Sequence, residues 1–183
     1  AGDDLVPGRL GDDTIYGGTG ADTLNGGAGD DRVFGGDGPD RAFLGGGDDL
    51  FADTAQGGEL GRDTVFGGTG NDTIQGGGGD DVFYGGAGND VIVGRMGNDR
   101  LTGGAGADRF VFAPGLETDI VTDFDLSADR LVFDDALWAA GQTALDFASV
   151  QNGSVVFAFD DGSRVVLLEL DSTAGLGGAI EVI

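Results

Sequence analysis

Twelve aspartates recur along this chain at a fixed spacing, and they are the residues best suited to chemistry. Successive members lie nine residues apart, apart from one step of fourteen: Asp4, Asp13, Asp22, Asp31, Asp40, Asp49, Asp63, Asp72, Asp81, Asp90, Asp99 and Asp108. Carboxylates held close together repel one another unless a cation neutralises them. A ligand set made only of oxygen selects a hard cation, and a flexible cage favours calcium over magnesium.

The rest of the composition narrows the chemistry further. The chain of 183 residues carries 33 acidic and nine basic residues, and it has no histidine, cysteine or lysine. These absences exclude thiol chemistry, ordinary zinc sites and Schiff-base chemistry. A formal net charge of −24 argues against nucleic acid and anionic membranes as direct partners. No apolar run reaches the roughly 18 residues of a membrane span.

Glycine and apolar residues accompany each aspartate in a nine-residue unit. Glycine occupies the fourth position of every copy and usually the first two, and an apolar residue occupies the eighth, from Val6 to Phe110. The glycines allow a tight turn, and the apolar residue marks a short strand. Two repeats, with two turns and two strands, can close one coil and stack on the next. The pattern therefore predicts an all-β parallel solenoid, whereas a collagen helix or a disordered linker would not keep this period.

The repeat divides the chain into two parts. Residues 1–111 carry the repeats, interrupted by five extra residues at about 53–57, and residues 112–183 lack the glycine period. Alternation at 119–124, a short strand at 130–133 and a hairpin of 154–159 with 164–170 predict a β segment that caps the open solenoid end. Asp123, Asp125 and Asp129 imitate EF-hand spacing, but Ala128 stands where that loop requires glycine.

Stacking brings each aspartate beside the next but one in the series, for example Asp63 beside Asp81 and Asp81 beside Asp99. The two oxygens of Asp81 are then expected to serve two ions, one on each side. Eight such pairs exist within the two series, and ten if the interruption only bulges a loop. The alternative to metal binding is that these aspartates only cap turns. Asparagine or serine could cap a turn equally well, and yet all twelve residues are aspartate.

These repeats, such as GGTGNDTIQ at 67–75, resemble the calcium-binding nonapeptide of the repeats-in-toxin (RTX) family. The stretches GGAGADRFVF (103–112) and TDIVTDFDLSADRLVF (118–133) are similar to the C-terminal domain of serralysin-type metalloproteases. The resemblance implies a right-handed parallel β-roll in which each ion takes one aspartate from each of two stacked turns. Carbonyls from positions two and four of one turn and one and three of the next complete the site. It further implies that Asp119 or Asp123 ligates a last calcium at the cap.

The glycines expected to present these carbonyls follow from the frame of the repeat. They are Gly17, Gly18, Gly20, Gly26, Gly27, Gly29, Gly67, Gly68, Gly70, Gly76, Gly77, Gly79, Gly85, Gly86, Gly88, Gly103, Gly104 and Gly106. The pattern departs at Arg9, Leu44, Glu59 and Arg95, where a side chain replaces the glycine of a tight turn.

Two outward-facing columns accompany the repeats. Asp12, Asp30 and Asp48 recur in every second repeat at position five, which predicts a solvated acidic edge or weak additional cation sites. At position nine, Tyr16 with Phe34 and Phe66 with Tyr84 are predicted to stack. Cross-strand packing explains such pairs, and a sugar or a neighbouring domain is the sharper alternative.

The functional prediction is a secreted, extracellular, calcium-binding module without catalytic activity. The C-terminal Glu181-Val182-Ile183 resembles the uncleaved signal of type I secretion substrates, and any catalytic domain is expected upstream of residue 1. The expected partners are about eight to ten calcium ions, an upstream domain of the same polypeptide and the type I secretion machinery. An adhesion or polysaccharide-binding module is the alternative function.

Overall fold

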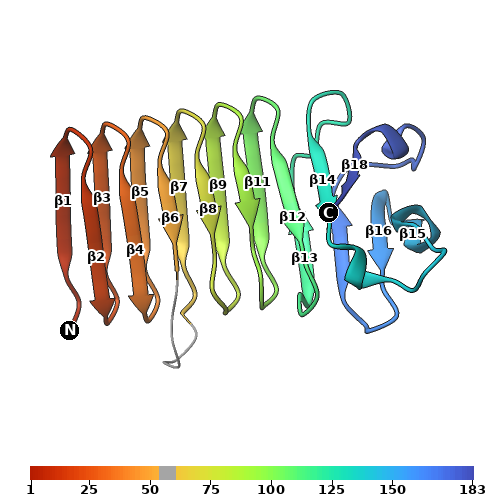
Figure 1. Cartoon of the computed structure of the whole chain (residues 1–183), viewed down its shortest axis with the longest axis horizontal. Helices are drawn as coiled ribbons and strands as arrows, with labels where there is room; N and C mark the ends of the chain where they lie inside the picture. The colour runs from red at the N-terminus through yellow and green to blue at the C-terminus, as the bar shows by residue number, and fades with distance from the viewer. Residues whose placement is uncertain (54–60) are drawn as a thin grey trace.

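The computed structural model describes residues 1–53 and 61–183, and these residues form a β-solenoid followed by a smaller group of antiparallel strands (Figure 1). The strands run across the long axis of the molecule, and the chain advances from one coil to the next. This is the parallel β-roll with an antiparallel C-terminal part that the sequence predicts. Within the described residues there is no α-helix, and hence none that could span a membrane.

Successive strands of the solenoid alternate between two sheets. The ten-stranded sheet contains, in spatial order, β1 (Leu5–Leu10), β3 (Thr23–Ala28), β5 (Arg41–Gly46), β7 (Thr64–Thr69), β9 (Val82–Ala87), β11 (Arg100–Ala105), β13 (Thr118–Val121), β17 (Arg164–Leu167), β16 (Ser154–Ala158) and β15 (Ala148–Gln151). The eight-stranded sheet contains β18 (Ile180–Val182), β14 (Arg130–Phe133), β12 (Arg109–Phe112), β10 (Val91–Val93), β8 (Thr73–Gln75), β6 (Leu50–Ala52), β4 (Arg32–Asp37) and β2 (Thr14–Thr19).

The parallel register matches the predicted stacking of each repeat on the next but one. Val6 pairs with Leu24 and Ile15 with Val33, so each step along a sheet spans two repeats. At the interruption the step is longer, as in the pair Ala42–Val65, and the ladder of β5 with β7 remains parallel. Of the inserted residues, 54–57 lie outside the described part of the chain, as does Glu59. The interruption therefore leaves the two sheets continuous.

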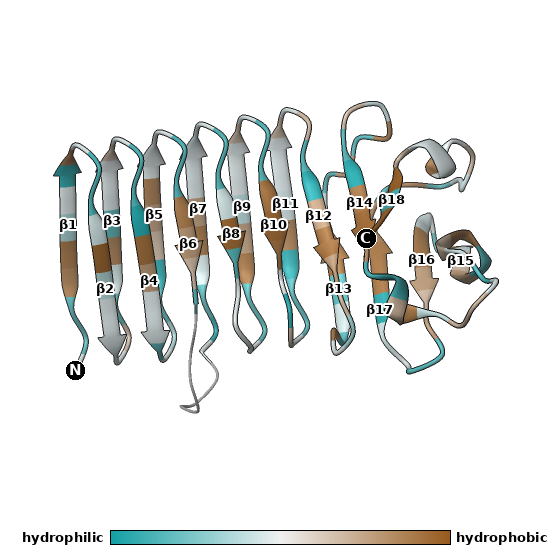
Figure 2. Cartoon of the chain, viewed as in Figure 1, coloured by the Kyte–Doolittle hydropathy of each residue, from teal (hydrophilic) through white to brown (hydrophobic). Residues whose placement is uncertain are grey.

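The apolar residue of each repeat points between the two sheets. From Leu24 to Phe110 this side chain is fully buried, whereas Val6 at the N-terminal end is only partly covered. Figure 2 shows this core as brown bands at matching heights on the strands. Position eight supplies one such side chain per repeat, so the core of the roll is narrow. Burying each of them stabilises the fold by about 1.5–3 kcal/mol.

The C-terminal residues extend both sheets before they close the end of the roll. β13 pairs with β11, β14 with β12, and β18 with β14, all in parallel, so the sheets continue beyond the last nonapeptide. The predicted hairpin is confirmed as β16 and β17. Three short 3₁₀ helices, η1 (Asp135–Leu137), η2 (Ala144–Phe147) and η3 (Leu176–Gly178), complete this part.

Aromatic side chains form the centre of this C-terminal part. Phe133 contacts Phe112, Trp138, Phe157 and Phe159, with ring centroids 5.3–6.0 Å apart. Because Phe112 and Phe133 belong to the solenoid sheet, this cluster covers the end of the solenoid core. The sequence tail that resembles a secretion signal includes β18, which adds a strand to the same sheet.

Candidate metal centre

The recurring aspartates form two columns, one along each turn-bearing edge of the roll. One column contains Asp4, Asp22, Asp40, Asp63, Asp81 and Asp99, and the other contains Asp13, Asp31, Asp49, Asp72, Asp90 and Asp108. Asp4 is exposed and Asp13 half-buried, and the other ten are at most 3% exposed. Ten carboxyl groups are thus withdrawn from water in two regular rows.

The two oxygens of each carboxylate have different surroundings. Oδ1 accepts a hydrogen bond from the main-chain N–H of the aspartate one coil earlier, at 2.7–3.1 Å along both columns. For Asp81 the donor is the N–H of Asp63 at 2.8 Å. One oxygen of Asp81 therefore also joins adjacent coils, and its predicted service to two ions stays a prediction.

The other oxygen, Oδ2, is buried and lacks a hydrogen-bond partner at ten of these aspartates. Within the described residues these are Asp13, Asp22, Asp31, Asp40, Asp49, Asp72, Asp81, Asp90, Asp99 and Asp108. A buried carboxylate oxygen without a partner is costly, and native proteins pair such atoms with a donor or a metal. The oxygen without a partner, repeated along both columns, is thus available to a cation.

A main-chain oxygen of the next coil shares this space. A Cβ atom added to Gly17 would lie 2.6 Å from Oδ2 of Asp22 and 2.5 Å from the carbonyl oxygen of Gly35. At Gly76 the corresponding atoms are Oδ2 of Asp81 at 2.7 Å and the oxygen of Gly94 at 2.5 Å. Both oxygens lie around one point at about the 2.3–2.6 Å of calcium–oxygen bonds. The first glycine of these two repeats therefore leaves an oxygen-lined cradle.

Burial raises the pKa of many of these carboxyl groups. Burial is the largest cause at Asp81, whose pKa rises to about 8, with a hydrogen bond from Asp63 acting against it and the charges of Asp63 and Asp99 adding to it. Burial likewise raises the pKa of Asp63 and Asp72 to about 7. Without a cation, the folded roll therefore favours protonated aspartates, and a cation must supply the missing neutralisation at neutral pH.

The predicted glycines take the conformations that the tight turns need, with one exception. At positions two and four all of them have positive φ, apart from Gly77. Arg9 and Arg95, which replace a glycine, keep the same conformation at φ 94° and 78°. Leu44 instead stands at position one, where its side chain is fully buried. These three departures from the pattern therefore leave the coils stacked.

Two further aspartates extend the columns beyond the last repeat. Asp119 accepts from the N–H of Asp99, and Asp129 accepts from the N–H of Asp108. The family resemblance suggests Asp119 or Asp123 as a last ligand. Asp119 continues the column, whereas Asp123 accepts hydrogen bonds from the N–H groups of Gly103 and Gly104. Oδ2 of Asp129 accepts from the N–H of Asp125, so an amide stands where an ion would. Both aspartates follow their partners by slightly more than two repeats, and the nine-residue frame therefore missed them.

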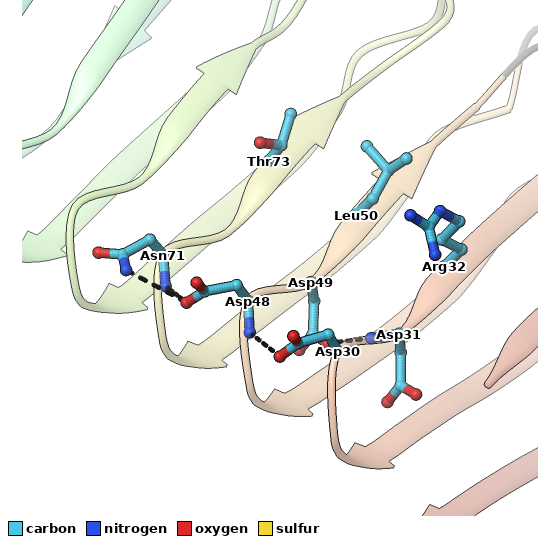
Figure 3. Close-up of a pocket in the computed structure, with 8 residues that line it drawn as sticks. All are labelled: Asp30, Asp31, Arg32, Asp48, Asp49, Leu50, Asn71 and Thr73. Carbon is cyan, nitrogen blue, oxygen red and sulfur yellow. Dashed lines mark hydrogen bonds between the residues drawn. The ribbon is translucent and has the colours of Figure 1, made fainter. Parts of the chain in front are cut away.

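The acidic column at position five is also present, outside the main column. The N–H of Asp30 donates to Asp12 at 2.9 Å, and that of Asp48 donates to Asp30 at 2.8 Å. Figure 3 shows Asp30, Asp48 and Asn71 linked in this way along the edge, beside Asp31 and Asp49. Asparagine continues the ladder at Asn71, so hydrogen bonding explains this column without a cation.

The donor set of the two main columns fits calcium. It consists of carboxylate and carbonyl oxygens in a chain that has neither histidine nor cysteine. In the part of the chain that the structure describes, no three acidic side chains form one metal-binding group. Main-chain oxygens would therefore supply much of the coordination, as a flexible site with six or more oxygen ligands requires.

Comparison with known proteins supports this chemistry. The model of the RTX calcium-binding nonapeptide repeat matches residues 7–42, 25–52, 57–92 and 84–115, which together cover more than half of the chain. None of the curated proteins that were compared matches the chain significantly.

Two solved structures show a weak likeness. The extracellular lipase LipA of Serratia marcescens is 20% identical over 90% of this chain, with a TM-score of 0.45, and the chain spans 40% of the length of that lipase. The AlgE6R3 subunit of the Azotobacter vinelandii mannuronan C5-epimerase is 22% identical, with 91% of this chain and 82% of that subunit covered and a TM-score of 0.35. Family membership therefore depends on the repeats. The matched nonapeptides, stacked in two aspartate columns, make this chain a member of the RTX calcium-binding nonapeptide repeat family.

Proposed function

We propose that this chain is a calcium-folded, non-catalytic module of a larger protein that leaves the cell by type I secretion and folds outside it. The observation that carries the proposal is the set of ten buried aspartate oxygens without a hydrogen-bond partner among the described residues. These atoms make the folded state depend on a cation, because burial without one disfavours the charged carboxylates.

Ten stacked levels support a stoichiometry of about ten calcium ions. Each pair of successive aspartates in a column defines one level, and the two columns between Asp4 and Asp108 contain five levels each. The levels Asp40–Asp63 and Asp49–Asp72 are included, because the register persists across the interruption.

The calcium affinity would allow the chain to fold outside the cell and keep it unfolded in the cytosol. Extracellular calcium modules bind with dissociation constants of roughly 0.1–1 mM, far above the free calcium of a cytosol. With a net charge of −24 and a narrow apolar core, the chain remains unfolded before export, in a form that can pass through a secretion channel. Outside, binding of calcium to the folded state alone drives folding by mass action.

The decisive experiment is a calcium titration of the full chain, starting in chelator. Circular dichroism should show a largely unfolded chain at first and a cooperative gain of β structure near millimolar calcium. Magnesium at equal concentration should do much less, because it requires octahedral geometry and retains its waters. A compact β-rich chain in excess chelator at pH 8 would contradict the proposal.

The alternative of a polysaccharide-binding module draws on the exposed aromatic residues. Tyr16 stacks on Phe34, and Phe66 stacks on Tyr84, with centroids 4.9 and 5.0 Å apart, which confirms the predicted pairs. Phe43 extends the second pair, and the Arg41 guanidinium lies over its ring. Because these rings stack face to face, much of the surface that would hold a sugar ring is already used. We therefore favour cross-strand packing as their role, and retention on a glycan affinity gel would reverse that preference.

A further inference from the structure

Asp53 is a buried carboxylate that the nonapeptide pattern does not predict. It follows β6 directly, at the position where the other coils of this edge have Gly35, Gly76 and Gly94. Only 2% of Asp53 is exposed. Asp53 thus puts a carboxylate in the place of the first glycine of the repeat. It lies buried in the same edge as an aspartate column, and turn formation alone does not explain this.

On one side, Asp53 faces the turn that belongs to Asp40. The N–H of Gly36 donates to Oδ1 of Asp53 at 3.2 Å. A Cβ atom added to Gly35 would lie 2.7 Å from Oδ2 of Asp40, as in the other cradles. However, no carbonyl oxygen of the described residues lies within 3.6 Å of that point, whereas the equivalent point at Gly17 has one at 2.5 Å. Among the described residues, the Asp40 cradle thus lacks the main-chain oxygen found at Gly17 and Gly76, and it has a carboxylate beside it.

On the other side, Asp53 faces the following turn. A Cβ atom added to Gly77 would lie 2.6 Å from Oδ2 of Asp53, and the N–H of Asp53 donates to the carbonyl of Gln75 at 2.9 Å. Gly77 is also the predicted glycine that lacks the positive φ of its equivalents. The carboxylate therefore lies between the turns at 35–38 and 76–79. It belongs to the interrupted coil, which stacks between the coils of those two turns.

Asp53 thus adds a buried carboxylate to the edge that carries Asp40, Asp63 and Asp81. Carboxylates held close together repel one another unless a cation neutralises them.

We propose that the Asp53 carboxylate is a calcium ligand at the interrupted coil, where it takes the place of the main-chain oxygen that the Asp22 and Asp81 cradles have. This inference rests on the proposed function, since it requires that the columns bind calcium. A charged oxygen in place of a neutral one raises the affinity of a calcium site, because affinity follows the number of charged ligands. The insertion then leaves the array with one site of different composition rather than one site fewer.

The test compares three variants of the full chain by calorimetric calcium titration and by bound calcium per chain. Asp53→Asn retains an acceptor for Gly36 but removes the charge, and it should lose about one ion or bind one ion about 10-fold more weakly. Asp53→Glu keeps a carboxylate and should bind like the parent. Asp37→Asn removes an acidic side chain from the adjoining turn and should change nothing. Circular dichroism at 10 mM calcium, a concentration about ten times the expected dissociation constants, reports whether each variant folds.

The outcomes separate the two proposals. Loss of one ion in Asp53→Asn alone, or failure of that variant alone to fold, supports the inference. A full complement of calcium bound with the affinity of the parent in Asp53→Asn overturns it and leaves Asp53 as a hydrogen-bond acceptor. Equal losses in Asp53→Asn and Asp53→Glu also overturn it, because shape rather than charge would then matter. If the parent itself binds no calcium, the proposed function fails before Asp53 is at issue.

Discussion

Substitution of Asp81 by asparagine should weaken the calcium-bound roll by an amount that grows with calcium. Asp81 borders two levels of its column, since its Oδ1 accepts from Asp63 and its N–H donates to Asp99. Asparagine keeps the acceptor for Asp63 but removes the charge from the unpartnered Oδ2 position. The variant should therefore bind about two ions fewer than the parent, or bind them much more weakly.

The magnitude follows from mass action. An ion with a dissociation constant of about 0.5 mM stabilises the folded state by about 1.8 kcal/mol at 10 mM calcium and by about 0.65 kcal/mol at 1 mM. Loss of two ions thus costs about 3.6 kcal/mol at 10 mM, which lowers Tm by roughly 7–14 °C for a chain of this size. At 1 mM calcium the difference should shrink to roughly 3–5 °C.

The measurement is thermal unfolding by circular dichroism at both calcium concentrations, with Asp37→Asn as the control. Asp37 stands at the third position of its repeat, where its main-chain carbonyl accepts from Gly20 at 2.9 Å, and its substitution should stay within about 0.5 kcal/mol. A Tm difference for Asp81→Asn that is equal at the two concentrations would mean a packing defect and would refute the metal-based reasoning. Equal shifts for the two variants would show that the side chain of the sixth position has no special role.

Three further outcomes are expected. In chelator, β structure should increase as the pH falls from about 8 to about 4, because Asp81 and Asp119 have folded-state pKa values raised from 3.8 to about 8, mainly by burial. Such groups stabilise the folded state at low pH and lose that contribution as the pH rises through the raised pKa. A circular dichroism signal that instead grows with pH would contradict this. Removal of residues 112–183 should raise the calcium midpoint of folding, since it takes away the strands that pair with β11 and β12, and an unchanged midpoint would argue against capping. Gly88→Ala should lower Tm more than Gly115→Ala, because both glycines have positive φ but only at Gly88 would a Cβ atom collide with the carbonyl of Gly70, and equal losses would leave backbone strain as the sole cause.

The sequence by itself determined the architecture and the positions of the recurring aspartates. A period of nine with glycine at position four and an apolar residue at position eight requires turns and short strands, and a coil of two repeats places each residue beside its equivalent two repeats further on. The pairing of Val6 with Leu24 and the stacking of Tyr16 on Phe34 follow from that arithmetic alone. These features recur with a fixed period, so the period itself predicts them.

Only the tertiary structure decided how the pattern behaves where its spacing changes. The ladder continues from Asp40 to Asp63 across the interruption and from Asp108 to Asp129 beyond the last repeat, because stacking is set by main-chain pairing between coils. A longer connection costs little extra closure entropy, so the coils can absorb inserted residues without losing register. The same change of spacing brings Phe43 onto Phe66, a contact that the regular step of two repeats would not reveal.

The structure also decided what each carboxylate oxygen does. The sequence shows one recurring aspartate per repeat, but only the stacked coils show that Oδ1 joins neighbouring main chains while Oδ2 remains without a partner. It likewise placed Asp53 between two turns, whereas the sequence only assigned Asp53 to the interruption. Both facts depend on contacts between coils, and such contacts are fixed by packing in space rather than by the order of residues along one repeat.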